Sequence, residues 1–209
     1  MSGSIEGVTG LVLAGGLSRR MQGANKAFLP LGQQSLTRHV IDRLQPQVNR
    51  CLLSGPETVC QLAPELTCIA DILPGHLGPL AGILSGLAWL QQHDSETRWL
   101  VSLPCDTPFF PTDLVARLLA RQSLSPDALL VIASCEGRLH PVVGLWSVEL
   151  ADRIRDALID GQVPRMMEWT RQQRHAVEEF EIDRVDPFFN VNRPQDYERA
   201  KSIRRAAFE

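Results

Sequence analysis

Short apolar runs alternate along this chain with segments whose apolar residues recur at helical spacing. The first run, residues 8–14, ends at Gly15 and Gly16, which is typical of a buried strand followed by a tight turn. Strands buried on both faces are continuously apolar, and strand-helix alternation builds a mostly parallel sheet. The pattern therefore predicts an α/β fold, a three-layer sandwich with helices on both faces of a mostly parallel sheet. We expect strands at residues 8–14, 51–53, 67–70, 99–103, 129–133 and 142–146, and helices near residues 36–44, 80–90, 114–119 and 150–158 and after residue 194.

Size and composition indicate an ordinary globular protein. The chain has 209 residues, 44% hydrophobic and 22% charged, which predicts one domain over residues 1–209. The net charge of −3 argues against a nucleic-acid partner. The five cysteines, an odd number without a CxxC pair, predict no disulfide framework or zinc site. We see neither a signal peptide nor an apolar run that could span a bilayer, so we expect a cytoplasmic protein without a membrane partner.

The glycines after the first strand open the most informative segment, LAGGLSRRMQGANK at residues 13–26. A triphosphate needs backbone N–H groups that approach closely, which Gly15 and Gly16 permit, and it needs cations. Arg19, Arg20 and Lys26 supply three. The alternative is a strand-to-helix turn with a solvated basic patch, but the order of strand, glycines, arginines and lysine favours a phosphate-binding loop.

Two carboxylates also follow predicted strands. Asp106 follows residues 99–103 after Pro104 and Cys105, and Asp71 follows residues 67–70. Ligands bind at the carboxyl ends of strands in an open α/β sheet, so we expect both near the glycine loop. One such carboxylate suffices for Mg²⁺, which keeps several waters and adds substrate phosphates. An Asx-turn is an equally good explanation for Asp106.

Two further segments are weaker signals. The Gly/Pro-rich stretch around Gly78 opens the helix with the clearest apolar stripe, and a helix N-terminus beside glycines favours anions. Asn190 and Asn192 flank Val191, so both face one side of an extended segment and can bind a polar ligand. Capping of the following helix is the favoured role of Asn192. We interpret His140, a lone histidine before a proline, as structural.

These motifs together resemble the molybdenum cofactor guanylyltransferase family. The resemblance covers residues 10–197 and rests on LAGGLSRRMQGANK, LGPLAG, PCDTP and NVN. The glycine loop is shared with sugar-nucleotide and cytidylyltransferases, whereas PCDTP and NVN in so short a chain are more specific. Members are Rossmann-like single-domain enzymes that join GMP from GTP to molybdopterin. The chain departs from the family pattern at Gln22, Asn25 and Ser54.

The resemblance implies a role for each candidate residue. Asp106 would bind Mg²⁺ and GTP, Lys26 would contact phosphate, and one or both of Arg19 and Arg20 would stabilise charge on the departing pyrophosphate. The acceptor side, for molybdenum-molybdopterin, would be Asn190 and Asn192. The implied nucleotide-binding residues are Leu13, Ala14, Gly15, Gly16, Lys26, Ser54, Asp71, Gly78 and Asp106.

The implied reaction needs no general base. A phosphate monoester has a second pKa near ~6, so the acceptor phosphate is already an anion that can attack the α-phosphorus of GTP. Transient contacts with proteins that make or receive the cofactor are also implied. Two alternatives remain open: a cytidylyltransferase acting on molybdopterin or a sugar phosphate, and a non-catalytic nucleotide-binding or partner-docking protein. The oligomeric state is not determined by the sequence.

Overall fold

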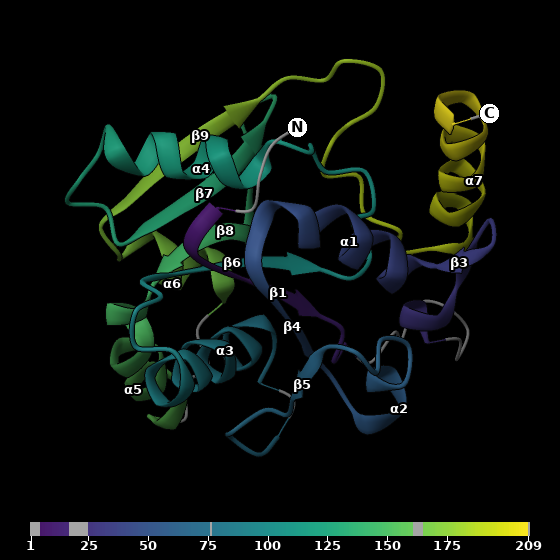
Figure 1. Cartoon of the computed structure of the whole chain (residues 1–209). Coiled ribbons are helices and arrows are strands. Elements are labelled where there is room, and N and C mark those ends of the chain that lie inside the picture. The colour runs from purple at the N-terminus through teal and green to yellow at the C-terminus, as the bar shows by residue number, and fades with distance from the viewer. Residues whose placement is uncertain (1–4, 17–24, 76, 161–164, 209) are drawn as a thin grey trace.

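The computed structural model describes residues 5–16, 25–75, 77–160 and 165–208 (Figure 1). Its strands are β1 (Ile5–Leu13), β2 (Pro30–Leu31), β3 (Gln34–Ser35), β4 (Val48–Ser54), β5 (Thr67–Ile69), β6 (Trp99–Pro104), β7 (Leu130–Cys135), β8 (Arg138–Ser147) and β9 (His175–Phe180). Its α-helices are α1 (Leu36–Leu44), α2 (Glu57–Cys60), α3 (Pro79–His93), α4 (Leu114–Ser123), α5 (Ala151–Ile159), α6 (Met166–Arg171) and α7 (Pro194–Phe208). Short 3-10 helices are η1 (Lys26–Phe28), η2 (Gln45–Gln47) and η3 (Val148–Leu150).

Seven strands form the central sheet in the order β5-β4-β1-β6-β8-β7-β9. Strand β8 is antiparallel to both of its neighbours, whereas all the other pairs are parallel. The predicted mostly parallel sheet is therefore confirmed. In the register of the central strands, Leu13 at the end of β1 lies beside Ser54 of β4 and Pro104 of β6. Three strand ends thus meet at one edge of the sheet.

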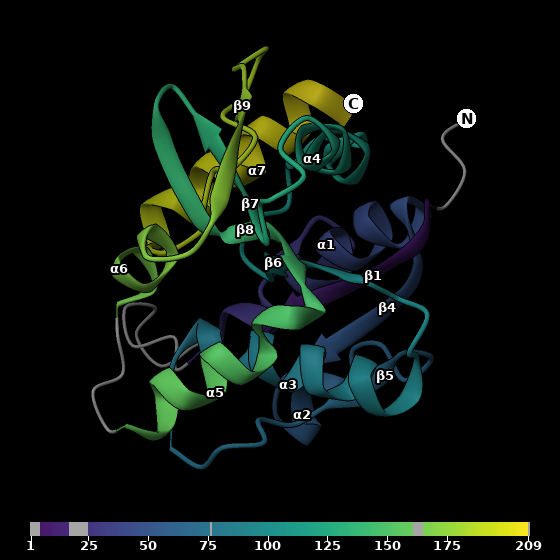
Figure 2. The ribbon, with the colours of Figure 1, turned by 90° about the vertical axis from the view of Figure 1, so that its left-hand side faces the viewer.

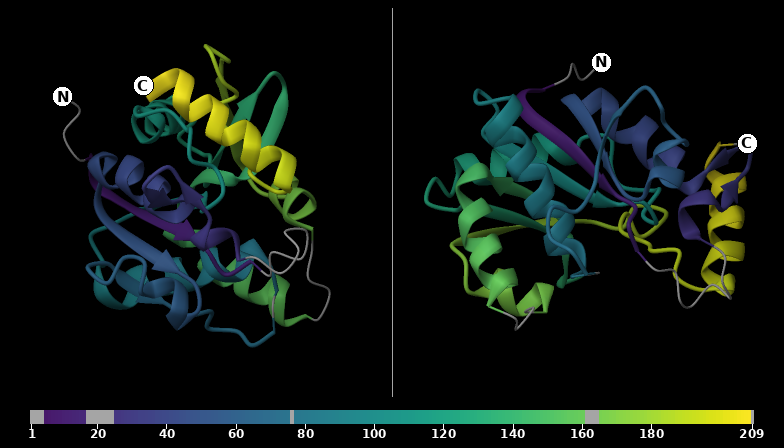
Figure 3. Two further views of the ribbon diagram at one scale, coloured as in Figure 1. Left: turned by 90° about the vertical axis from the view of Figure 1, so that its right-hand side faces the viewer. Right: turned by 90° about the horizontal axis from the view of Figure 1, so that it is seen from below.

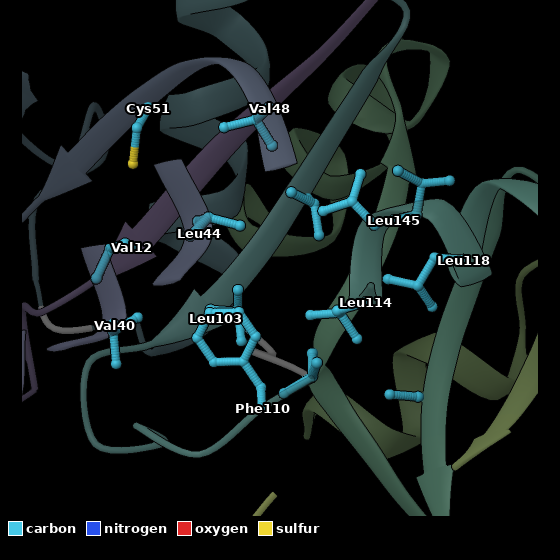
Figure 4. Packing of buried hydrophobic residues seen from close by; sticks show 14 of the residues in the cluster. Val12, Val40, Leu44, Val48, Cys51, Leu103, Phe110, Leu114, Leu118 and Leu145 are labelled. Atoms are coloured by element: carbon cyan, nitrogen blue, oxygen red, sulfur yellow. The ribbon is translucent and has the colours of Figure 1, made fainter. Parts of the chain in front are cut away.

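Helices cover both faces of this sheet, as predicted. Helices α1 and α4 pack on one face and α3 and α5 on the other (Figures 1 and 2). Figure 4 shows the first of these layers, where Leu44 and Leu114 meet the strand residues Val12 and Leu103. Each of these side chains is fully buried, which stabilises the fold by roughly 1.5–3 kcal/mol per residue.

Helix α7 is longer than the short helix expected after residue 194, and it packs away from the main sheet (Figure 3). Its Ala200 joins a small buried cluster with Leu31, Leu36 and Val191. The hydroxyl of Tyr197 donates a hydrogen bond to the carbonyl oxygen of Pro30. These contacts hold the chain just before the helix, residues 190–192, against the body of the protein.

Several features differ from the sequence-based expectation, among them the short elements α2, β2 and β3, which were not expected. Helix α6 and strand β9 were not expected either. Strand β9 lies at the sheet edge and carries two glutamates, so it lacks the continuous apolar run of a buried strand. Strand β8 begins at Arg138, four residues before the expected start. Cys60 and Cys68 are joined by a disulfide, with Cα atoms 5.8 Å apart, although none was expected from the odd cysteine count. This pairing arises because α2 and β5 are neighbours in space, which the cysteine spacing does not reveal.

Candidate functional site

A cleft of about 720 Å³ lies at the sheet edge where β1, β4 and β6 end. Candidate site residues from separate parts of the sequence meet there. For Gly15, Asp71 and Asp106, this is what their positions after strand ends predicted. Arg19 and Arg20 lie outside the described residues. The candidates that line the cleft are Leu13, Ala14, Gly15, Gly16, Lys26, Ser54, Asp71, Gly78, Asp106, Asn190 and Asn192.

The glycine loop enters this cleft from a firmly held strand end. The Ala14 N–H donates to the Ser54 carbonyl at 2.7 Å, and the Cys105 N–H donates to the Leu13 carbonyl at 3.0 Å. Gly15 and Gly16 are exposed, and a Cβ atom on either would meet no atom of the described residues within 4 Å. Packing against the described part of the chain therefore does not require glycine at these two positions. Their missing side chains instead leave the backbone open to a ligand in the cleft.

Lys26 connects the nucleotide side of the cleft with the C-terminal segment. Its Nζ lies 3.1 Å from Oδ2 of Asp106 and also donates to Oδ1 of Asn192. The Lys26 and Asp106 side chains are only 15% and 16% exposed. Asp106 thus forms an ion pair in the cleft, a contact that the Asx-turn interpretation did not include.

The expected capping role of Asn192 is wrong. The Asn192 side chain accepts from Lys26, and it is the carboxylate of Asp196, in the first turn of α7, that accepts the N–H groups of Asn192 at 3.0 Å and Arg193 at 2.8 Å. The Asn192 side chain is therefore available for its contact with Lys26. Sequence spacing could not separate these possibilities, because both residues are suitable hydrogen-bond acceptors near the helix start.

A second connection joins Asn190 to the loop that carries Asp106. The buried Thr107 hydroxyl donates to Oδ1 of Asn190, and the Val191 N–H donates to the Asp106 carbonyl at 2.9 Å. The backbone and side-chain contacts align residues 190–192 with residues 106–107. With its oxygen engaged by Thr107, the Asn190 amide keeps its NH₂ group as a donor.

Helix α3 forms the side of the cleft next to Ser54 and Asp71. Gly78, which precedes the helix, has φ of 83°, a left-handed conformation that glycine adopts without strain. A Cβ atom on Gly82 would lie 2.5 Å from Cδ2 of Leu13 and 3.2 Å from Oγ of Ser54. Gly82 thus permits the close approach of α3 to these strand ends. The sequence interpretation included Gly82 only as part of LGPLAG and gave it no role, because a helical glycine carries no signal of what lies opposite.

The far wall of the cleft is the largest part of the site that the sequence interpretation did not predict. It consists of residues 138–143 at the start of β8. Because β8 is antiparallel to β6 and pairs Gly144 with Ser102, the residues before Gly144 extend toward and past the end of β6. The sequence interpretation noted His140 but assigned it a structural role, and gave Arg138 none. Which strand lies beside β6 is a property of the topology, not of a local motif.

Two titratable groups in the cleft are kept neutral at neutral pH. Burial lowers the pKa of His140 and the charge of Arg138 acts in the same direction, while the carboxylates of Asp186 and Glu179 oppose them. The His140 ring also packs on Phe188 at 4.8 Å between centroids. Burial, and then the Asp106 charge, raises the pKa of the Cys105 thiol to about 12. Cys105 is therefore not a nucleophile at neutral pH.

The acidic groups suit magnesium better than zinc. Among the described residues, no three His, Cys, Asp or Glu side chains form a group that could hold a metal ion. Mg²⁺ needs only one or two protein carboxylates when substrate phosphates and water complete its shell. Asp106, a carboxylate in a cleft that also contains an open glycine loop, matches this donor set.

No helix within the described ranges has both the length and the apolar character needed to cross a membrane.

Comparison with known proteins agrees with this architecture. The solved structure of molybdopterin-guanine dinucleotide biosynthesis protein A from Archaeoglobus fulgidus has the same fold, with a TM-score of 0.72 at 19% identity over 95% of this chain and 99% of that one.

The sequence similarity to curated relatives extends over almost the whole chain. A molybdenum cofactor guanylyltransferase from Rhodopseudomonas palustris is 40% identical over 92% of this chain and 90% of its own length. One from a Bradyrhizobium species is 39% identical over 100% of this chain and 97% of its own. The model of the MobA-like NTP transferase domain matches residues 10–177. The chain therefore belongs to the molybdenum cofactor guanylyltransferase family of MobA-like NTP transferase domains.

Proposed function

We propose that this protein transfers GMP from GTP to the terminal phosphate of molybdenum-molybdopterin and releases pyrophosphate. The observation that carries this proposal is the contact of Lys26 with both Asp106 and Asn192. It joins the glycine-loop side of one cleft to the C-terminal segment and so provides a place where two phosphorylated substrates meet. The names of the two relatives above support the choice of substrates.

The nucleotide would occupy the side of the cleft formed by β1, β4 and α3. The backbone of residues 13–16, which is exposed at Gly15 and Gly16, would hold the guanine nucleotide, with Ser54, Asp71 and Gly78 around it. Ser54 is buried and its carbonyl is already bonded to Ala14, so its hydroxyl is the group left for the ligand. Glycine backbones permit the close approach that base and phosphate contacts need.

Charge neutralisation would come from Lys26 and Asp106. Asp106 would hold Mg²⁺, which supplies positive charge to the phosphates when it is bound. Lys26, held by Asp106 and Asn192, would donate to a phosphate oxygen from a pre-oriented position. Arg19 and Arg20, one or both, would stabilise the charge on the leaving pyrophosphate.

Chemistry in this cleft requires positioning rather than proton transfer. An oxygen of the acceptor phosphate would bond to the α-phosphorus as the bond from that phosphorus to the bridging oxygen breaks, and the electron pair would leave with pyrophosphate. The acceptor is already ionised at neutral pH, so no base is needed. The neutral Cys105 and His140 agree with this scheme, because neither has to act as a nucleophile or a base.

Thr107 provides a test of the acceptor side. Thr107→Val removes the hydroxyl that holds Asn190, and we expect the KM for the acceptor to rise roughly 5-fold, since a hydrogen bond contributes about 1 kcal/mol. The KM for GTP should stay within about 2-fold, and Thr107→Ser should restore the acceptor KM because it keeps the hydroxyl. Steady-state kinetics with each substrate varied would measure both constants. An equal rise in the two KM values would contradict an acceptor-side role for Asn190.

The direct test is release of pyrophosphate that depends on GTP, acceptor and Mg²⁺ together. Consumption of CTP in place of GTP would identify a cytidylyltransferase, and no release of pyrophosphate with either nucleotide would indicate a binding protein.

Four other expectations stay predictions. They are the cytoplasmic location, the single domain, the absence of nucleic-acid and membrane partners, and transient contacts with proteins that make or receive the cofactor.

A further inference from the structure

Arg138 is a cation in the cleft for which the reaction described above has no role. It is the first residue of β8, at the end of the β7–β8 hairpin, which projects from the sheet in Figure 2. Its side chain lines the same cleft as Lys26 and Asp106 but belongs to the opposite wall. Arg138 and His140 are two residues apart on one strand, so they project from the same face of it.

The hairpin that carries Arg138 is well defined. Its turn residues Glu136 and Gly137 have φ of 49° and 72°, the left-handed pair that a tight two-residue hairpin requires. The Glu179 carboxylate of neighbouring β9 accepts the Gly137 N–H at 3.1 Å. The backbone position of Arg138 is therefore fixed by its own turn and by the adjacent strand.

No described carboxylate forms an ion pair with Arg138 within 4.0 Å. In the segments outside the described residues, the only carboxylate side chain is Glu209 at the C-terminus. Arg138 is exposed, so its guanidinium can reach a ligand in the cleft. An arginine with free donors beside a ligand cleft is suited to an anion, and its planar fork matches phosphate oxygens.

The cleft has few charged side chains among its described lining residues. Among the described lining residues, the acidic groups are Asp71 and Asp106 and the basic ones are Lys26 and Arg138. Lys26 is engaged by Asp106 on the nucleotide side. Two phosphorylated substrates must nevertheless approach each other, and like charges repel. A cation on the wall opposite the nucleotide side would offset this repulsion for the acceptor phosphate.

We propose that Arg138 binds the terminal phosphate of the acceptor and holds it against repulsion from the triphosphate. This inference rests on the proposed function for the identity of the acceptor. His140, on the same strand face as Arg138, is neutral and adds a polar group without a second charge. Asn190, whose Oδ1 accepts from Thr107, has its NH₂ group as a further donor for the phosphate. Arg138 thereby becomes a substrate-binding residue that acts together with Asn190.

Kinetics of Arg138→Gln test the proposal. We expect the KM for the acceptor to rise roughly 10-fold to 100-fold, the range for loss of a charge-assisted hydrogen bond, while GTP affinity changes by less than about 2-fold. Arg138→Lys should give an intermediate KM, because it keeps the charge and loses the fork. Arg174→Gln is the matched control: this exposed arginine precedes β9 at the opposite end of the sheet, and its acceptor KM should equal that of the wild type.

An unchanged acceptor KM in Arg138→Gln would overturn the inference, and so would equal losses of affinity for the acceptor and for GTP. A binding experiment separates this failure from failure of the proposed function. Inorganic phosphate is titrated onto protein saturated with α,β-methylene GTP, and we expect weaker binding by Arg138→Gln than by the wild type or Arg174→Gln. If the wild type transfers no GMP, the proposed function is wrong, and the phosphate titration still decides whether Arg138 is an anion site.

Discussion

Asp106→Asn is expected to lower the rate of GMP transfer on the order of 10³-fold while the protein stays folded. The substitution keeps the shape of the side chain and removes its charge. Asp106 is the carboxylate that pairs with Lys26, so its loss removes the proposed magnesium ligand and the partner that orients the lysine. The measurement is single-turnover GMP transfer at saturating GTP, acceptor and Mg²⁺, with circular dichroism to verify the fold.

Asp127→Asn is the matched control for this experiment. Asp127 is exposed and lies in the loop between α4 and β7, outside the residues that line the cleft. It should transfer GMP at the wild-type rate. Full magnesium-dependent activity in Asp106→Asn would show that the metal is held elsewhere.

Lys26→Met is expected to weaken the binding of GTP roughly 10-fold to 100-fold. Hydrogen bonds to charged groups contribute about 1.5–3 kcal/mol, and about 1.4 kcal/mol corresponds to a factor of ten in affinity. Methionine retains the length and apolar stem of lysine but supplies no charge. Equilibrium titration with GTP and Mg²⁺ in the absence of acceptor measures this change, since no turnover then occurs.

The chain supplies its own control, because Lys201 is its only other lysine. Lys201 lies on α7 and pairs with Glu198. Lys201→Met should bind GTP like the wild type. If Lys26→Met did so as well, the lysine would serve only to neutralise Asp106 and to hold Asn192.

Much of the nucleotide side could be predicted from the sequence because its signals are local. Gly15 and Gly16 directly follow an apolar run, and Asp71 and Asp106 lie within three residues of the end of one. A parallel sheet brings the ends of its strands to one edge. The structure has all three loops in one cleft. The individual roles of these residues in binding and catalysis stay predictions.

The acceptor side could not be predicted to the same extent, because it depends on contacts between distant elements. Arg138 reaches the cleft since β8 is inserted antiparallel between β6 and β7, an order that no local spacing encodes. Asn192 was interpreted as a helix cap, yet Asp196 accepts the backbone N–H groups at that helix start. The contact between Lys26 and Asn192 spans 166 positions of sequence.

The central claim is that GTP and the acceptor react in this one cleft. The measurement that tests this claim most directly is the release of pyrophosphate by the purified protein with GTP, Mg²⁺ and molybdenum-molybdopterin. Each component is omitted in turn. We predict one pyrophosphate for each guanine dinucleotide formed and no release when the acceptor, GTP or Mg²⁺ is left out. Release that is independent of the acceptor, or a preference for CTP over GTP, would contradict the account.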